Sequence, residues 1–250
     1  MYFQSAIQSR RPVIHALMNH VASPFVANGL LAIGALPVMA EHPTEMKEVT
    51  RKADGLVINT GTPSNDKWQA SLFAGKEANQ IDIPIVIDPV GVGLSSFRLE
   101  HITQLLEKVQ PTVIKANHSE LLSLAQLDTS MHCVDATKTL PIETLAKQLA
   151  LHYQTIIVAT GETDFITDGI QQTSIHGGSQ WMSRMTGTGC LLGGVIAAYL
   201  AVTDDKQDYF TAVEAAIYDY KNAAQTAEQK CNHFGFFKAE WMNQLAQGGK

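Results

Sequence analysis

A glycine-rich turn in the last third of the chain is the feature of the sequence that most directly suggests chemistry. Residues 186–191 read TGTGCL and open a long apolar stretch that is typical of a helix. Glycines let the backbone approach an anion, and the unpaired N–H groups and dipole at a helix start stabilise its negative charge. The turn is neither a Walker A loop nor a dinucleotide fingerprint, because GxxxxGK[ST] occurs nowhere and GTGCLLGG lacks the GxGxxG spacing. The alternative is a tight connection whose glycines serve close packing.

Cys190 lies in the first turn of that predicted helix. A thiol at a helix start, beside an anion-binding loop, is expected to have its pKa lowered from about 8.5 towards neutrality. The thiolate could then take a proton from a substrate hydroxyl. The alternative is that Cys190 is a small buried hydrophobe, as most free cysteines are.

Two carboxylates and a lysine form a second group of candidate residues. Asp88 and Glu120 each follow a predicted strand, and Lys115 shortly precedes Glu120. Mg²⁺ is usually held by one or two carboxylates together with substrate phosphates, so the pair predicts a divalent-cation site. Lys115 would supply a point charge for a nucleotide phosphate. The alternatives are a helix N-cap or a surface carboxylate for each acid, and a solvated side chain for the lysine.

Buried strands must position these residues. Short runs rich in Val, Ile and Leu, bounded by turn residues, predict strands. They are Pro12–Leu17, Leu36–Met39, Gly55–Thr60, Pro84–Asp88, Thr112–Ala116 and Thr155–Thr160. In open α/β sheets ligands bind beyond the carboxyl ends of the strands, so the polar residues there are the first candidates for a site. They lie in 59–62, 88–93, 115–120 and 160–162.

Helical patterns alternate with these strands. They cover 43–53, 67–80, 98–109, 117–125 and 141–153, and Ser23-Pro24 predicts an N-cap and first helical residue for a helix that ends at Gly34. After Thr160, two short strands around Asp168-Gly169 predict a hairpin, and three helices follow over 187–202, 208–229 and 237–247. The predicted fold is α/β, with a mostly parallel central sheet, helices on both faces and a short edge hairpin.

We expect one domain over residues 6–250, because no linker, low-complexity tract or internal repeat divides the chain. Residues 2–5 read YFQS, which is similar to the remnant of a tag-cleavage site, so residues 1–5 are left out of the fold prediction.

Composition excludes several classes of function. The net charge of −6 argues against a broad basic surface for nucleic acid or anionic membrane. The three cysteines have no CxxC spacing, which predicts neither disulfides nor zinc and favours a reducing cytoplasm. No apolar run reaches the roughly 20 residues of a membrane span. Only 17% of residues are charged, against roughly 25% in an average chain, which predicts strands buried on both sides or a subunit interface.

Together these motifs resemble those of the ribokinase-like superfamily and, within it, the hydroxyethylthiazole kinases. The similar segments run from His15 to about Val202: HALMNHV and ANGLLAIGALPVM near the start, then DPVGVG, NHSE, ATGE with Asp164, and TGTGC. The last motif discriminates best, because most relatives in the superfamily carry Asp where this chain has Cys190.

The resemblance implies transfer of the γ-phosphate of ATP to the hydroxyl of 4-methyl-5-(2-hydroxyethyl)thiazole. It assigns the anion hole to Gly187, Thr188 and Gly189, with Cys190 beside the substrate hydroxyl. Gly187, Met39, Asn19 and Val21 would form the thiazole site, Lys115 and Thr160 would contact ATP, and Asp88 and Glu120 would organise Mg²⁺. It also implies a homotrimer with sites between protomers. The alternatives are a nucleotide-dependent dehydratase of hydrated nicotinamide cofactors, another small-alcohol kinase such as a hydroxymethylpyrimidine kinase, or a binding protein without catalysis.

Overall fold

The computed structural model describes residues 2–126 and 141–248, and its centre is one eight-stranded sheet. The strand order is β2-β1-β3-β4-β5-β6-β7-β8. The strands are β1 (Val13–Leu17), β2 (Leu36–Val38), β3 (Gly55–Asn59), β4 (Ile85–Asp88), β5 (Val113–Asn117), β6 (Ile156–Thr160), β7 (Asp164–Thr167) and β8 (Gln172–Ile175). All pairings from β2 to β6 are parallel, and β7 and β8 add an antiparallel hairpin at one edge. The predicted α/β class, parallel sheet and edge hairpin are confirmed.

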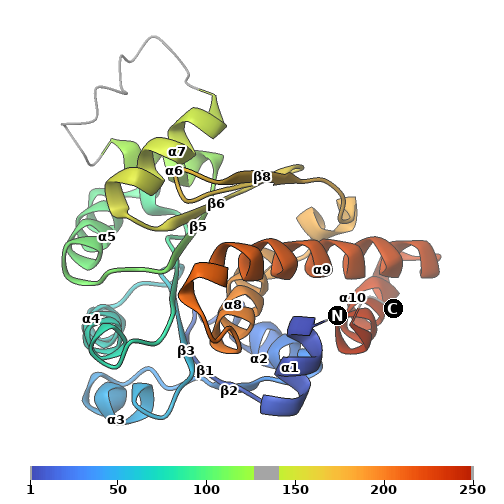
Figure 1. Cartoon of the computed structure of the whole chain (residues 1–250), viewed down its shortest axis with the longest axis horizontal. Helices are drawn as coiled ribbons and strands as arrows, with labels where there is room; N and C mark the ends of the chain where they lie inside the picture. The colour runs from blue at the N-terminus through green and yellow to red at the C-terminus, as the bar shows by residue number, and fades with distance from the viewer. Residues whose placement is uncertain (1, 127–140, 249–250) are drawn as a thin grey trace.

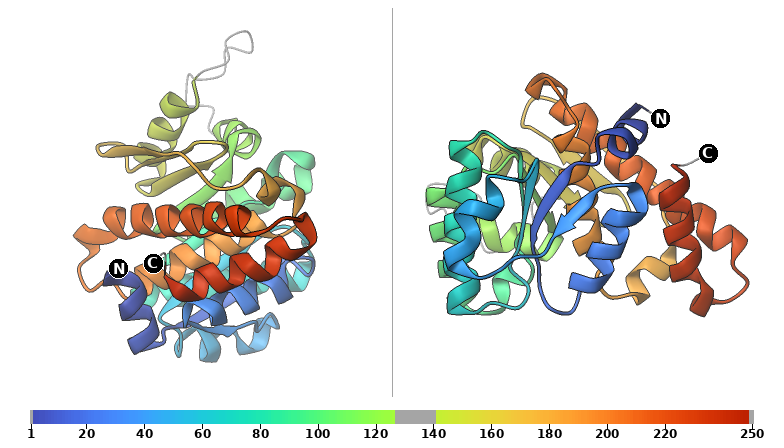
Figure 2. Two further views of the ribbon diagram at one scale, coloured as in Figure 1. Left: turned by 90° about the vertical axis from the view of Figure 1, so that its right-hand side faces the viewer. Right: turned by 90° about the horizontal axis from the view of Figure 1, so that it is seen from below.

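Helices cover both faces of this sheet (Figures 1 and 2). One layer contains α1 (Tyr2–Arg10), α2 (Ser23–Ile33), α8 (Thr188–Ala201), α9 (Tyr209–Lys230) and α10 (Phe234–Gln247). The other contains α3 (Met46–Thr50), α4 (Asn65–Gln80), α5 (Ser96–Lys108), α6 (His118–Ala125) and α7 (Ile142–Tyr153). Among the described residues, no helix is both long and apolar enough to cross a bilayer.

The central strands are apolar along their whole length because each of their faces belongs to a different core. In β3, Leu56 and Ile58 pack into the core beneath α4, whereas Val57 packs into the core beneath α8. In β4, Ile85 and Val86 separate in the same way. This two-sided burial accounts structurally for the low charged fraction.

Helix α8 is buried almost all round. Residues 191–200 are buried, since the helix lies between the sheet, α2 and α9. Its contact with α2 requires a glycine, because a Cβ on Gly29 would overlap the Leu191 side chain. Leu191, near the start of α8, therefore packs directly against the backbone of α2.

Two local predictions are wrong. The N-cap of α2 is Ala22, not Ser23, and its N–H is bound by the Asn19 side chain at 2.9 Å. The helix predicted over 43–53 is a 3-10 turn (Pro43–Glu45) followed by the short α3.

The N-terminal segment omitted from the fold prediction is helical in the structure. Residues 2–5 belong to α1, and the buried Gln4 donates to the carbonyl of Leu245 in α10. This contact places the two ends of the chain side by side (Figure 1). The origin of the YFQS segment stays a prediction.

Candidate active site

The parallel strands bring the predicted polar residues to one edge of the sheet. Asn59 at the end of β3 is in register with Asp88 at the end of β4, and Asn117 at the end of β5 is in register with Thr160 at the end of β6. The loops after these strands, and the start of α8 above them, therefore surround one site.

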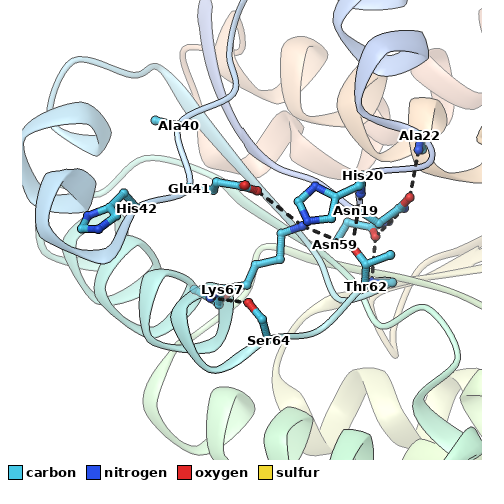
Figure 3. A network of polar contacts seen from close by, with 12 residues as sticks. Asn19, His20, Ala22, Ala40, Glu41, His42, Asn59, Thr62, Ser64 and Lys67 are labelled. Atoms are coloured by element: carbon cyan, nitrogen blue, oxygen red, sulfur yellow. Dashed lines mark hydrogen bonds and ion pairs between the residues drawn. The ribbon is translucent and has the colours of Figure 1, made fainter.

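Asn59 is the centre of a buried hydrogen-bonded group. Its Nδ2 donates to Asp88 Oδ2 at 2.6 Å and to Cys190 Sγ at 3.3 Å, and its Oδ1 accepts from Asn19 Nδ2 at 2.9 Å. Asn19 Nδ2 also lies 3.3 Å from Cys190 Sγ. Figure 3 shows Asn19 between Asn59 and the backbone of Ala22. We call Asn19, Asn59, Asp88, Lys115 and Cys190 the Asn59 network.

Lys115 joins this network through a buried ion pair. Its Nζ lies 2.9 Å from Asp88 Oδ1, and both side chains are at most 5% exposed. Burial opposes the charged form of Lys115, but attraction to Asp88 and Glu120 outweighs it and raises the lysine pKa. Burial also disfavours the charged form of Asp88. It therefore raises the pKa of this carboxyl, although the attraction of Lys115 acts in the opposite direction. A Cβ on Gly189 would lie 3.7 Å from Lys115 Nζ, so this ammonium faces the glycine turn.

Contacts with several elements hold the glycine turn. Gly187 caps α8 with φ of +90°, and a Cβ there would lie 3.2 Å from both Ala22 and Phe25. The Thr188 hydroxyl donates to the Met182 carbonyl, and the Thr188 carbonyl accepts from Tyr220 Oη at 2.6 Å. Because the first N–H groups of a helix have no intrahelical acceptor, this fixed turn can bind an anion next to Lys115.

Glu120 lies beside the network and caps its own helix. Its Oε2 accepts from the Asn117 N–H and its Oε1 from the Gly91 N–H, each at 2.9 Å. Asn117 in return accepts from the Glu120 N–H, which completes a capping box. The N-cap of α6 is thus Asn117, and Glu120 takes part in the capping box as its N3 residue. Glu120 also acts electrostatically on Asp88 and Lys115.

The remaining predicted residues lie at the same edge but outside the Asn59 network. Thr160 ends β6, Met39 directly follows β2 and is partly buried against the core, and Val21 lies in the β1–α2 loop with 65% of its surface exposed. At the opposite, amino edge there is a cavity of about 780 Å³, lined by residues such as Pro84, Thr112 and Ile156. It contains none of the predicted site residues.

Comparison with known proteins places this chain in a family. The model of the hydroxyethylthiazole kinase family matches residues 4–248. A hydroxyethylthiazole kinase of Histophilus somni is 42% identical over 247 residues, which cover 98% of this chain and 92% of that protein. The chain belongs to the hydroxyethylthiazole kinase family.

Solved structures agree with this assignment. The structure of a hydroxyethylthiazole kinase protein from Pyrococcus horikoshii is 29% identical, with a TM-score of 0.88 over 100% of this chain and 93% of that one. A ribokinase-like superfamily protein from Enterococcus faecalis shares the fold at 15% identity, with a TM-score of 0.65 over 96% of this chain and 89% of that one. The expected ribokinase-like fold is confirmed.

The expectation of a lowered pKa for Cys190 is wrong. The pKa of Cys190 is raised, not lowered, because burial and the nearby Asp88 carboxylate disfavour the thiolate more than Lys115 and the two asparagines favour it. Proximity to a helix start does not decide the charge of this thiol. At neutral pH Cys190 is a neutral thiol.

The sequence does not predict three residues that hold this edge of the sheet together. The only sequence signal of Asn59 is that a polar residue ends a predicted strand. Arg98 in α5 donates to the carbonyls of Thr60, Gly61 and Val90, and so ties two loops at the edge. The arginine has no sequence signal, because its three acceptors are backbone groups.

Lys67 is the third missed residue. It is buried in the first turn of α4, where burial lowers its pKa. It lies 3.5 Å from Glu41 and donates to Thr62 Oγ1, which accepts the His20 N–H (Figure 3). Lys67 thereby supports the loop that carries Asn19.

We predict that alkylation of Cys190 by iodoacetamide will require high pH. A raised pKa keeps the thiol protonated at pH 7, so the rate should still be increasing above pH 9, the ordinary pKa of a cysteine. The measurement uses a variant with Cys133→Ser and Cys231→Ser, of which position 133 lies outside the described residues. A rate that levels off below pH 8 would contradict the raised pKa.

Proposed function

We propose that this chain transfers the γ-phosphoryl group of ATP to the hydroxyl of 4-methyl-5-(2-hydroxyethyl)thiazole. Family membership supports the reaction. The observation that carries the site is the Asn59 network, which joins Cys190 at the glycine turn to the buried Lys115–Asp88 pair. Phosphoryl transfer asks a protein mainly for alignment and for stabilisation of charge.

Each residue of the edge has a role in this proposal. The N–H groups of Gly187, Thr188 and Gly189 bind the migrating phosphoryl group, and Lys115 and Thr160 bind ATP. The thiazole alcohol lies against Gly187, Met39, Asn19 and Val21, with its hydroxyl beside Cys190. Since Asn19 donates to Cys190 Sγ, the amide holds the thiol in one orientation.

Cys190 contacts the acceptor in this proposal without serving as a strong base. Its raised pKa leaves it protonated at neutral pH. In a loose, metaphosphate-like transition state the acceptor hydroxyl does not have to lose its proton early. Alignment of the hydroxyl with the phosphoryl group therefore contributes more to the rate than a base does. We therefore assign Cys190 to orienting the hydroxyl.

Asp88 and Glu120 fit Mg²⁺ held through water. Each carboxylate already accepts hydrogen bonds or an ion pair within the protein, and the described residues contain no cluster of three His, Cys, Asp or Glu that could enclose a metal. Mg²⁺ characteristically keeps several waters and uses one or two carboxylates with substrate phosphates. When bound, it would neutralise phosphate charge.

A homotrimer with sites between protomers is part of the proposal. Apolar side chains at the carboxyl edge are exposed, among them Val21 at 65% and Leu94 at 79%. A neighbouring copy would cover them and close the thiazole site. We also place the protein in the cytoplasm, in keeping with the free thiols of Cys190 and Cys231.

The direct test is an assay of the purified protein with ATP, Mg²⁺ and the thiazole alcohol. We expect a phosphorylated thiazole and ADP in equal amounts. Hydroxymethylpyrimidine and hydrated NADH are the matched alternative substrates. Turnover of either one without turnover of the thiazole would replace the proposed function by that of another small-alcohol kinase or of the dehydratase.

We predict that Glu120→Gln raises the Mg²⁺ concentration for half-maximal activity by about tenfold, the lower end of the usual effect of residues that orient metal ligands. The amide cannot accept from both the Asn117 and Gly91 N–H groups. A titration of activity with Mg²⁺ measures the change, and Glu143→Gln on the exposed surface of α7 is the control. A Glu120→Gln response equal to that of the parent protein would remove Glu120 from the metal site.

Light scattering tests the assembly. We expect a mass three times the 27.2 kDa of the chain. A mass of one chain for an active enzyme would contradict shared sites.

A further inference from the structure

A third buried lysine, Lys221 of α9, lies outside the Asn59 network and the proposed catalytic group. Its Nζ is 3.2 Å from Asp164 Oδ2 at the start of β7. It also donates to the carbonyls of Glu162 and Ile175, each at 3.1 Å. The side chain is 5% exposed. The three N–H groups of the ammonium therefore have three acceptors, and this lysine is held in one place.

The acceptors belong to two segments that Lys221 joins. Glu162 lies in the β6–β7 loop and Ile175 ends β8. A hydrogen bond of 2.8 Å between the side chains of Thr163 and His176 connects the same segments. The chain then passes over the lysine stem at Gly178, where φ is +89° and a Cβ would lie 3.5 Å from Lys221 Cε.

The ion pair also holds the residue after Thr160. Asp164 Oδ1 accepts from the Gly161 N–H at 2.9 Å, while its Oδ2 faces Lys221. A carboxylate bound at both oxygens cannot turn. The backbone at Gly161 is therefore fixed through Asp164 by an amino group that comes from α9.

The position of this pair suggests why a cation is needed. Asp164 lies within the electrostatic influence of Lys115, the lysine proposed to bind ATP. An unpaired buried carboxylate at this place would repel a triphosphate, whereas a paired one does not. Tyr220, next to Lys221 in α9, donates to Thr188 in the glycine turn, so consecutive residues hold both sides of the proposed ATP site.

We propose that Lys221 is a positioning residue for the binding of ATP. The lysine acts by fixing the Thr160–Asp164 loop, and it contacts neither ATP nor the thiazole alcohol. The inference rests on the proposed ATP site. It gives α9 a part in nucleotide binding beyond covering the sheet.

Two variants test this. Lys221→Met removes the ammonium. The double variant, Lys221→Met with Asp164→Asn, also removes the buried charge of the carboxylate. The new amide can still accept from the Gly161 N–H. The double variant therefore provides the test if the single variant does not fold. Lys230→Met replaces an exposed lysine of the same helix and is the control.

Calorimetry measures the Kd for ATP with Mg²⁺, and separate titrations measure binding of the thiazole alcohol. In both variants we expect the Kd for ATP to rise, by about tenfold in the double variant, equivalent to about 1.4 kcal/mol, and by more in Lys221→Met, which leaves the Asp164 charge unpaired. The Kd for the thiazole should change less than about twofold in either variant. The control should bind both as the parent does.

The outcomes separate this inference from the proposed reaction. A folded double variant with the ATP affinity of the parent, or equal losses for ATP and thiazole, overturns the positioning role. A parent protein that binds ATP but does not phosphorylate the thiazole overturns the reaction and leaves the role of Lys221 intact. A parent protein that does not bind ATP overturns both.

Discussion

The ion pair between Lys115 and Asp88 is the interaction on which the rest of the site depends. Lys115 lies within β5 and Asp88 ends the neighbouring strand β4, and both side chains are almost completely buried. Removal of one partner from such a pair typically costs about 3–5 kcal/mol, because the other charge stays buried without compensation. Asn59 extends the pair by binding the second oxygen of Asp88 and reaching Cys190, so a charge pair in the sheet orients a thiol on α8.

The glycines of the turn have both of the roles that the sequence suggests: some allow close packing, and others leave the backbone open towards Lys115. Gly187 packs against α2, where a side chain would meet Ala22 and Phe25. Gly189 and Gly193 face Lys115, with Cβ positions 3.7 Å from its Nζ and 4.0 Å from its Cε. The lysine stem thus lies under a strip of α8 without side chains. Close packing and an exposed anion-binding backbone are produced by the same residues.

The helices on both faces do more than cover the sheet. Arg98, Lys67 and Lys221 come from α5, α4 and α9, and each donates to groups in the loops at the carboxyl edge. Loops of a parallel sheet have few partners of their own there, and cations from the surrounding helices supply the missing donors. Gln4, a neutral donor, connects the two chain ends instead, by binding the Leu245 carbonyl in the last turn of α10.

By itself the sequence determined the alternation of strands and helices, the parallel sheet with its hairpin, and the residues that gather at its carboxyl edge. Hydrophobic runs, turn residues and the TGTGC motif are local signals, and parallel strands necessarily end on the same side. Only the tertiary structure decided that Asn59 is the centre of the network, that Asn19 binds both the Ala22 N–H and Cys190, and that the pKa of this thiol is raised. Asn19 and Cys190 are 171 positions apart, and the burial of the thiol depends on how α8 packs on β3 and β4. Contacts and desolvation of this kind arise from packing between distant segments, so no local pattern of residues reports them.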